Sequence, residues 1–132
     1  MSLDSGPLKI ELSEFSIKHP DTRLSMAETS SPPGIVIKVD GALDTQNSGD
    51  FQVVLAGALE IAKEYGALVL DLSRLNYISS TGVGTLTNIL VESRRHQLPF
   101  FLCAISVQAR SILDVLGFTS FFPLIDECGE AP

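Results

Sequence analysis

The stretch ALVLDLSRLNYISSTGVGTLTNILV, residues 67–91, decides the fold because its apolar residues change from a strand pattern to a helical one. Residues 67–72 are almost wholly apolar, which is typical of a strand buried on both faces, and Asp71 falls where such a strand leaves the sheet at its carboxyl end. A polar loop follows at residues 76–84. The next apolar residues recur at helical spacing: Val83, Leu86, Leu90 and Val91. The stretch therefore predicts a strand, a loop and an amphipathic helix in that order.

The same alternation continues on both sides of this stretch. Residues 35–39 and 100–104 are also short apolar runs typical of buried strands. Apolar residues recur at helical spacing over residues 51–62 and again after Ser106, a suitable capping residue, and residues 121–125 predict a last strand. Strands that alternate with helices in this way indicate a mostly parallel sheet with right-handed crossovers.

The amino-terminal part predicts an antiparallel addition to this sheet. Apolar residues roughly alternate over residues 8–17, which predicts an edge strand with one solvated face. Residues 18–34 are polar and rich in proline, so they predict a long connection, with a short strand at residues 23–27. The fold class is therefore α/β, a mixed and mostly parallel sheet with an antiparallel amino-terminal edge strand and packed helices.

Length and composition predict one domain over residues 1–132, of which residues 1–7 form a flexible tail. A net charge of -7 disfavours a nucleic-acid partner, and no apolar stretch reaches the roughly 18 to 20 residues of a membrane span. Two cysteines make neither a disulfide framework nor a metal set, so we expect Cys103 to be a reduced core residue in a cytoplasmic protein without a metal or cofactor. His19 and His96 lack any supporting ligand spacing and are expected to be exposed.

Two loops are candidates for the functional site, since functional groups of open α/β sheets gather beyond the carboxyl ends of the parallel strands. The first covers residues 40–48. The second, residues 76–84, brings three consecutive hydroxyls and two glycines to the start of a helix, where unpaired amides and the helix dipole favour an anion such as a phosphoryl group. The alternative is that Ser79 or Ser80 only caps the helix, while the glycines allow close packing.

Other polar residues near these loops also have two interpretations. Asp44, Thr45 and Asn47 in the first loop predict either a surface that contacts a partner or a turn closed on its own backbone. Asp71 is either an acid near Thr81 or a structural carboxylate that caps the next loop.

Three segments resemble the STAS domain family of anti-sigma-factor antagonists: DLSRLNYISSTGVGTL at residues 71–86, GALDTQNS at residues 41–48 and LGFTSFFPLID at residues 116–126. This resemblance implies the family's fold over nearly the whole chain. It also implies a protein-interaction module that regulates transcription by partner switching and is not an enzyme.

In bacterial signalling members of the family, a serine or threonine immediately before the glycine of the signature loop is phosphorylated. The resemblance implies that this acceptor is Thr81 here, with Ser80 as the second choice. The implied partners are an anti-sigma factor with serine/threonine kinase activity, which binds only the unphosphorylated form, and a PP2C-type phosphatase. The residues implied in partner binding are Asp44, Thr45, Asn47, Ser79, Ser80, Thr81, Gly82 and Val83.

Two features depart from the family pattern. Ser79 stands where the best-studied members have an aspartate two residues before the acceptor. An alternative is therefore that the chain is not phosphorylated and serves as a scaffold subunit of a transporter or stress-signalling complex. The family's last helix is missing or truncated after residue 126, so a homodimer or another chain is an alternative cover for the apolar face. An interpretation from another class is a nucleotide-binding domain that uses STGVG as a phosphate loop, although that loop has no lysine.

Overall fold

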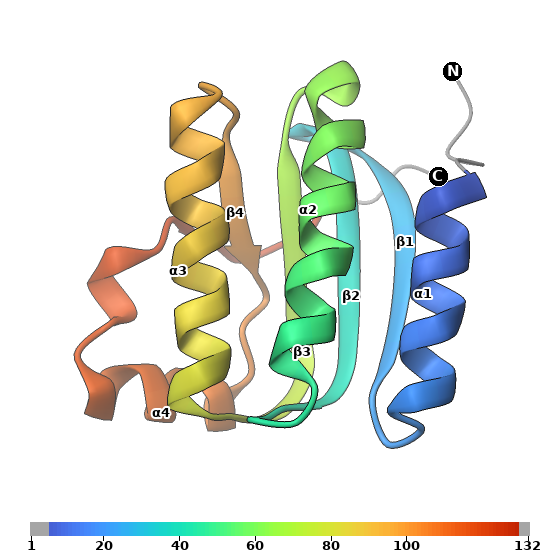
Figure 1. The fold of residues 1–132 in the computed structure, drawn as a ribbon. Coiled ribbons are helices and arrows are strands. Elements are labelled where there is room, and N and C mark those ends of the chain that lie inside the picture. The colour runs from blue at the N-terminus through green and yellow to red at the C-terminus, as the bar shows by residue number, and fades with distance from the viewer. Residues whose placement is uncertain (1–5, 130–132) are drawn as a thin grey trace.

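A five-stranded sheet forms the centre of the computed structural model, which describes residues 6–129 (Figure 1). The strands lie in the sheet in chain order: β1 (Arg23–Ser30), β2 (Pro33–Leu43), β3 (Leu68–Ile78), β4 (Phe100–Cys103) and β5 (Leu124–Ile125). The helices are α1 (Gly6–Lys18), α2 (Ser48–Tyr65), α3 (Ser80–Arg95), α4 (Val107–Leu116) and a short 3-10 helix, η1 (Thr119–Phe121). None of the helices within residues 6–129 has the length and apolar composition needed to cross a membrane.

The pairing of the strands confirms the predicted fold class. β1 pairs with β2 antiparallel, and the pairs β2–β3, β3–β4 and β4–β5 are parallel. Helices α1, α2 and α3 lie on one side of the sheet, and the main hydrophobic core fills the space between them and the strands (Figure 1). Ile37 of β2 and Leu70 of β3 are fully buried there, as expected of strands that are covered on both faces.

The predicted edge strand over residues 8–17 is wrong, because these residues belong to helix α1. Leu8 and Phe15 are buried seven residues apart, which is two helical turns, whereas Ile10 and Ile17 are 58% and 79% exposed. The apparently alternating apolar residues therefore belong to a helix of which only a narrow stripe is buried. The antiparallel edge exists, but β1 supplies it from within the expected connection. The expected tail is also wrong for residues 6 and 7, which start α1, and residues 1–5 lie outside the described residues.

β3 is longer than predicted, since it continues through Asp71 as far as Ile78. Its pairing with β2 shifts register twice, between Lys38 and Asp40 and between Gly41 and Ala42, and β3 contributes the extra residue each time. Because of the bulges, a buried residue occurs at every third position and not at every second one. The buried residues in the second half of β3 are therefore Leu72, Leu75 and Ile78. For this reason the segment reads as a polar loop, and Asp71 does not lie at a strand end.

β1 and β2 are also longer than predicted, since β1 continues to Ser30 and β2 runs from Pro33 to Leu43, through the first four residues of the predicted first loop. The boundaries of α2, α3 and α4 follow the predictions closely. The Ser106 hydroxyl accepts a hydrogen bond from the Ala109 amide at 3.1 Å and caps α4, and Gly117, in the left-handed conformation with φ of 79°, ends it. The predicted strand over residues 121–125 is shortened to β5 because Phe121 belongs to η1.

The second face of the sheet is covered by the C-terminal segment, residues 126–129, which passes behind the sheet (Figure 1). The Ser30 amide donates a hydrogen bond to the Gly129 carbonyl at 2.8 Å, which connects the end of this segment to the β1–β2 turn. Val36 and Val69 on this face are fully buried. Within the described residues, the apolar part of the second face is therefore covered by the chain itself.

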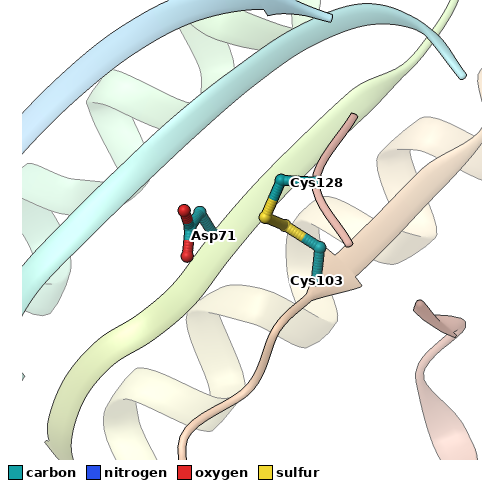
Figure 2. Close-up of side chains that lie close together, drawn as sticks. All are labelled: Asp71, Cys103 and Cys128. Atoms are coloured by element: carbon teal, nitrogen blue, oxygen red, sulfur yellow. A yellow bond between two sulfur atoms is a disulfide. The ribbon is translucent and has the colours of Figure 1, made fainter. Parts of the chain in front are cut away.

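The expectation of two reduced cysteines is wrong, because Cys103 of β4 and Cys128 of the C-terminal segment form a disulfide bond (Figure 2). Cys103 is fully buried, as predicted. Their pairing depends on β5, which lies parallel to β4 and returns the chain to the second face. A contact across 25 residues that requires this topology has no local sequence signal.

The helical assignment of α1 predicts different effects of alanine at Phe15 and at Ile17. Phe15→Ala removes a ring that packs edge-on against Phe51 in the core, so we expect a loss of about 3–5 kcal/mol in the free energy of unfolding. Ile17→Ala changes an exposed side chain and should stay within about 0.5 kcal/mol of the parent. Urea denaturation of both variants measures this. Equal losses would contradict the helix, since a strand would place both residues on one face.

Candidate functional site

The two predicted loops lie side by side where β2 and β3 end, at the bottom of Figure 1. Leu43, the last residue of β2, is paired with Ile78, the last residue of β3. One residue later, the Ser79 amide donates a hydrogen bond to the Leu43 carbonyl at 2.8 Å. The start of α3 is therefore attached directly to the first loop, and residues 44–47 and 79–82 form one continuous edge, which we call the loop edge.

The first loop is a turn that closes on its own backbone. One Asp44 carboxylate oxygen accepts hydrogen bonds from the amides of Gln46 and Asn47, each at 2.9 Å. The Asp44 carbonyl accepts from the amide and the hydroxyl of Ser48, the first residue of α2. This turn holds Thr45 and Gln46 exposed at its tip.

Asn47 connects the first loop to the β1 side of the sheet. Its side chain is buried, and its amide donates to the Ala42 carbonyl at 2.8 Å and to the Thr22 hydroxyl at 3.4 Å, while its oxygen accepts from the Asp44 amide at 2.9 Å. The Thr22 hydroxyl also donates to the Ala42 carbonyl at 2.9 Å. Asn47 thus satisfies buried polar groups in the interior and does not present its side chain to solvent.

Ser79 caps α3. Its hydroxyl accepts a hydrogen bond from the Gly82 amide at 3.1 Å, and its carbonyl accepts from the Val83 amide at 2.9 Å. Gly82 allows the helix to approach β2, because a Cβ atom there would lie 2.8 Å from the Ile78 side chain and 3.1 Å from the Leu43 carbonyl. The alternative of a serine cap with a packing glycine is therefore correct for these two residues.

The hydroxyls of Ser80 and Thr81 lie on the outside of this arrangement, since both residues are exposed in the first turn of α3. Within the described residues, neither of their amides donates a hydrogen bond to a protein acceptor, as is usual for a first helical turn. Two exposed hydroxyls thus stand beside unpaired amides at the positive end of a helix dipole.

The structure separates the eight residues implied in partner binding into two groups. Thr45, Ser80 and Thr81 are exposed and Asp44 is half-buried, so their side chains are accessible at the loop edge. The buried group consists of Asn47, Ser79, Gly82 and Val83. Buried residues can shape the loop edge but cannot offer a partner their side chains.

Asp71 does not belong to this site. It lies in the first half of β3, on the face covered by the C-terminal segment, and its carboxylate accepts from the Ser73 amide at 2.9 Å. Asp71 therefore does not stand at a strand end, and the interpretation of it as an acid near Thr81 is wrong, whereas its bond to the Ser73 amide agrees with a structural carboxylate. The cause is the unforeseen length of β3.

His19 is less exposed than predicted, with an exposed side-chain fraction of 18%, whereas His96 is exposed as expected. The Nε2 atom of His19 lies 2.7 Å from the Asp50 carboxylate in α2, and the His19 ring packs against Phe15. This hydrogen bond holds the pKa of Asp50 below its usual value. The interaction therefore stabilises the fold above the unfolded pKa of Asp50, and its contribution is lost as the pH falls through the lowered pKa.

Sequence reasoning missed three residues that shape or border the loop edge. Leu43 contributes its carbonyl and Thr22 its hydroxyl, and neither role has a sequence signal because both partners are distant along the chain. Tyr77 is exposed near the end of β3, beside Ala42 of β2. An exposed tyrosine next to a candidate interface was a usable signal, since tyrosine is enriched at protein interfaces.

The model of the STAS domain family matches residues 25–131 of this chain. The match covers most of the chain, including strands β2 to β5, β1 from residue 25 onward and the whole loop edge. The chain therefore belongs to the STAS domain family.

Similar proteins carry related names. BtrV of Bordetella bronchiseptica, provisionally named an anti-sigma factor antagonist, is 29% identical over 90 residues, which are 68% of this chain and 76% of BtrV. An anti-sigma factor antagonist from Mycobacterium paratuberculosis superimposes with a TM-score of 0.68 at 22% identity, covering 83% of this chain and 90% of that one. The phosphorylated form of the Bacillus cell fate determinant SpoIIAA gives 0.58 at 19% identity, covering 80% and 90%. At these identities the two structures show a shared fold.

Two glycines of α3 provide a matched test of the contact between this helix and β2. Gly82→Ala places a methyl group against Ile78 and the Leu43 carbonyl, so we expect a loss of about 1–3 kcal/mol in the free energy of unfolding. Gly84→Ala meets nothing within 4 Å and should stabilise the exposed helix by about 0.5–1 kcal/mol. Thermal or chemical denaturation of the two variants and the parent measures these changes in stability. If both variants gain stability, α3 does not approach β2 this closely.

Asn47→Ala should also destabilise the chain, by about 1–3 kcal/mol, because it leaves the part-buried Ala42 carbonyl and Asp44 amide with fewer partners. The control is Gln46→Ala at the exposed tip of the same turn, which removes no side-chain contact of this kind. The same denaturation experiment compares them. A neutral Asn47→Ala variant would show that this side chain does not secure the loop edge.

Proposed function

We propose that this protein is an anti-sigma factor antagonist that binds its partner through the loop edge and is released when Thr81 is phosphorylated. The observation that carries the proposal is the position of Thr81, exposed in the first turn of α3 and adjacent to the first loop. The STAS domain assignment and the names of the similar proteins support the same function.

The partner is an anti-sigma factor with serine/threonine kinase activity. In the phosphorylation step the Thr81 hydroxyl oxygen forms a bond to the γ-phosphorus of ATP on the partner, the bond to the leaving ADP oxygen breaks, and the hydroxyl proton passes to a base of the kinase. A PP2C-type phosphatase then hydrolyses the phosphothreonine with one water molecule, which restores the Thr81 hydroxyl and releases inorganic phosphate. The protein itself is the substrate of both reactions and catalyses neither, and both take place in the cytoplasm.

The start of α3 can accept this modification without refolding. A phosphothreonine adds about 1.5 to 2 negative charges and three acceptor oxygens. The amides of Ser80 and Thr81 have no other acceptor within the described residues, and the helix dipole favours the added charge. The phosphate then introduces charge and bulk into a surface that must dock closely, and the partner dissociates.

The serine at position 79 is compatible with this role, although the best-studied family members have an aspartate there. Aspartate and serine are both good residues for the helix N-cap, and the Ser79 hydroxyl makes the capping bond to Gly82. The exchange therefore preserves the conformation of the first turn of α3. It removes one negative charge beside the acceptor, which makes the site less repulsive to a phosphate.

Incubation with the kinase-type anti-sigma factor and ATP should add one phosphate, which tandem mass spectrometry maps to Thr81. Thr81→Glu should weaken partner binding at least about tenfold, which corresponds to about 1.4 kcal/mol, whereas Thr81→Ala should bind but accept no phosphate. The matched control is Ser13→Glu, which places the same charge at an exposed hydroxyl position on α1. Its binding should equal that of the parent.

The outcomes separate the alternatives. Phosphate mapped to Ser80 moves the acceptor by one position and overturns the choice of Thr81. Equal partner binding by Thr81→Ala and Thr81→Glu, without any phosphorylation, indicates the constitutive scaffold subunit. Tight binding of ATP by the isolated protein in calorimetry indicates the nucleotide-binding domain and contradicts the proposal.

A further inference from the structure

Three groups that commonly bind metal ions meet on the second face of the sheet, remote from the loop edge. One carboxylate oxygen of Asp71 and the sulfur atoms of Cys103 and Cys128 all lie within 4.8 Å of one another. They come from three separate segments, β3, β4 and the C-terminal segment, and Figure 2 shows the carboxylate beside the disulfide. Nothing in the proposed function uses them.

Reduction converts this cluster into a set of ligands for a thiophilic cation. A dithiol reductant donates two electrons and two protons, so that the Cys103–Cys128 bond becomes two thiols and the dithiol becomes its own disulfide. Both thiols lose a proton on metal binding. Two thiolates and a carboxylate are ligands of Zn²⁺, which takes four ligands in a tetrahedron, and a water molecule completes the set at a partly open site.

We propose that the reduced chain binds one Zn²⁺ ion through Cys103, Cys128 and Asp71, and that this ion replaces the disulfide as the link between the C-terminal segment and the sheet. The inference goes beyond the proposed function and does not depend on Thr81.

The surroundings of the cluster fit this role. Cys103 is fully buried, while Asp71 and Cys128 are half-buried, so one side of the cluster is open to an entering ion. The Ser73 amide donates to one oxygen of Asp71 at 2.9 Å, which orients the carboxylate as outer partners of metal ligands do. Lys38 is the β2 neighbour of Asp71 in register. Its positive charge balances the net negative charge left by one dication and three anionic ligands.

The geometry requires only a small movement of the C-terminal segment. Two sulfur ligands of a tetrahedral zinc ion lie about 3.8 Å apart, as follows from Zn–S distances of about 2.3 Å, so the sulfur atoms must separate from bonding distance. Cys103 is fixed in β4, whereas Cys128 belongs to a segment without helix or strand near the described end of the chain. Cys128 can therefore make the adjustment.

The consequence concerns the apolar cover of Val36 and Val69. In the cytoplasm, where the proposed function takes place, cellular thiols keep most disulfides reduced. Without a covalent or metal link, the C-terminal segment is held by noncovalent contacts such as the Ser30–Gly129 hydrogen bond, and fraying of the segment uncovers the two valines. A bound Zn²⁺ ion keeps the cover in place under reducing conditions.

The test uses the full chain reduced with a phosphine, which does not compete for the metal as a thiol does. Calorimetric titration with Zn²⁺ should give one site per chain, and Cd²⁺ should produce the ultraviolet thiolate-to-cadmium charge-transfer band. The oxidised protein should give neither signal. Zn²⁺ should also raise the Tm of the reduced protein, because a ligand that binds only the folded state stabilises it.

Variants assign the ligands. Asp71→Asn should weaken Zn²⁺ binding by at least about tenfold. Cys128→Ser should lose the 1:1 site and the rise in Tm, and it avoids a change at the buried Cys103. Asp40→Asn is the matched control, a carboxylate of β2 that lies near Arg74 and outside the cluster, and its affinity should equal that of the parent.

Three results would overturn the proposal: no 1:1 binding by the reduced parent, equal binding by the oxidised protein, or an unchanged affinity of Asp71→Asn. A reduced parent that binds Zn²⁺ while Thr81→Ala and Thr81→Glu bind the anti-sigma factor equally would support the metal site and contradict the proposed function. The two proposals therefore fail independently.

Discussion

The hydrogen bond from the Ser79 amide to the Leu43 carbonyl, at 2.8 Å, is the constraint on which the functional surface depends. It joins the chain just after β3 to the end of β2, and Gly82, which has no Cβ atom, allows α3 to approach β2 closely at this point. Parallel neighbouring strands already bring their carboxyl ends to one edge of a sheet. The hydrogen bond converts that general proximity into a fixed relation between the first loop and the start of α3.

This arrangement divides the polar residues of the loop edge by role. Asn47 and Ser79 are buried and satisfy backbone groups, so they fix the shape of the edge. Thr45 and Thr81 are exposed and available to another protein or to a kinase. A rigid support beneath an exposed hydroxyl suits a switch that acts by added charge, because the modification changes the surface without the energetic cost of refolding the helix.

Much of the fold could be predicted from local patterns, and each failure has a physical reason. Buried strands such as β2 and the helices that begin near Ser48 and Ser80 have clear local patterns, and the resemblance of the signature segment indicates the loop edge as the candidate site. The pattern of α1 resembles that of a strand because only a narrow stripe of the helix, with Leu8 and Phe15, is buried. The bulges of β3, the Thr22–Asn47 contact and the Cys103–Cys128 bond depend on pairing between distant segments, which no local pattern encodes.

The most direct test of the central claim is a nuclear magnetic resonance titration of the ¹⁵N-labelled protein with the anti-sigma factor. The account predicts that the amide signals of residues 44–47 and 79–82 shift or broaden together, because the two segments form one edge, while those of Val36 and Val69 on the second face remain unchanged. Perturbations confined to the second face, or to only one of the two loops, would contradict it.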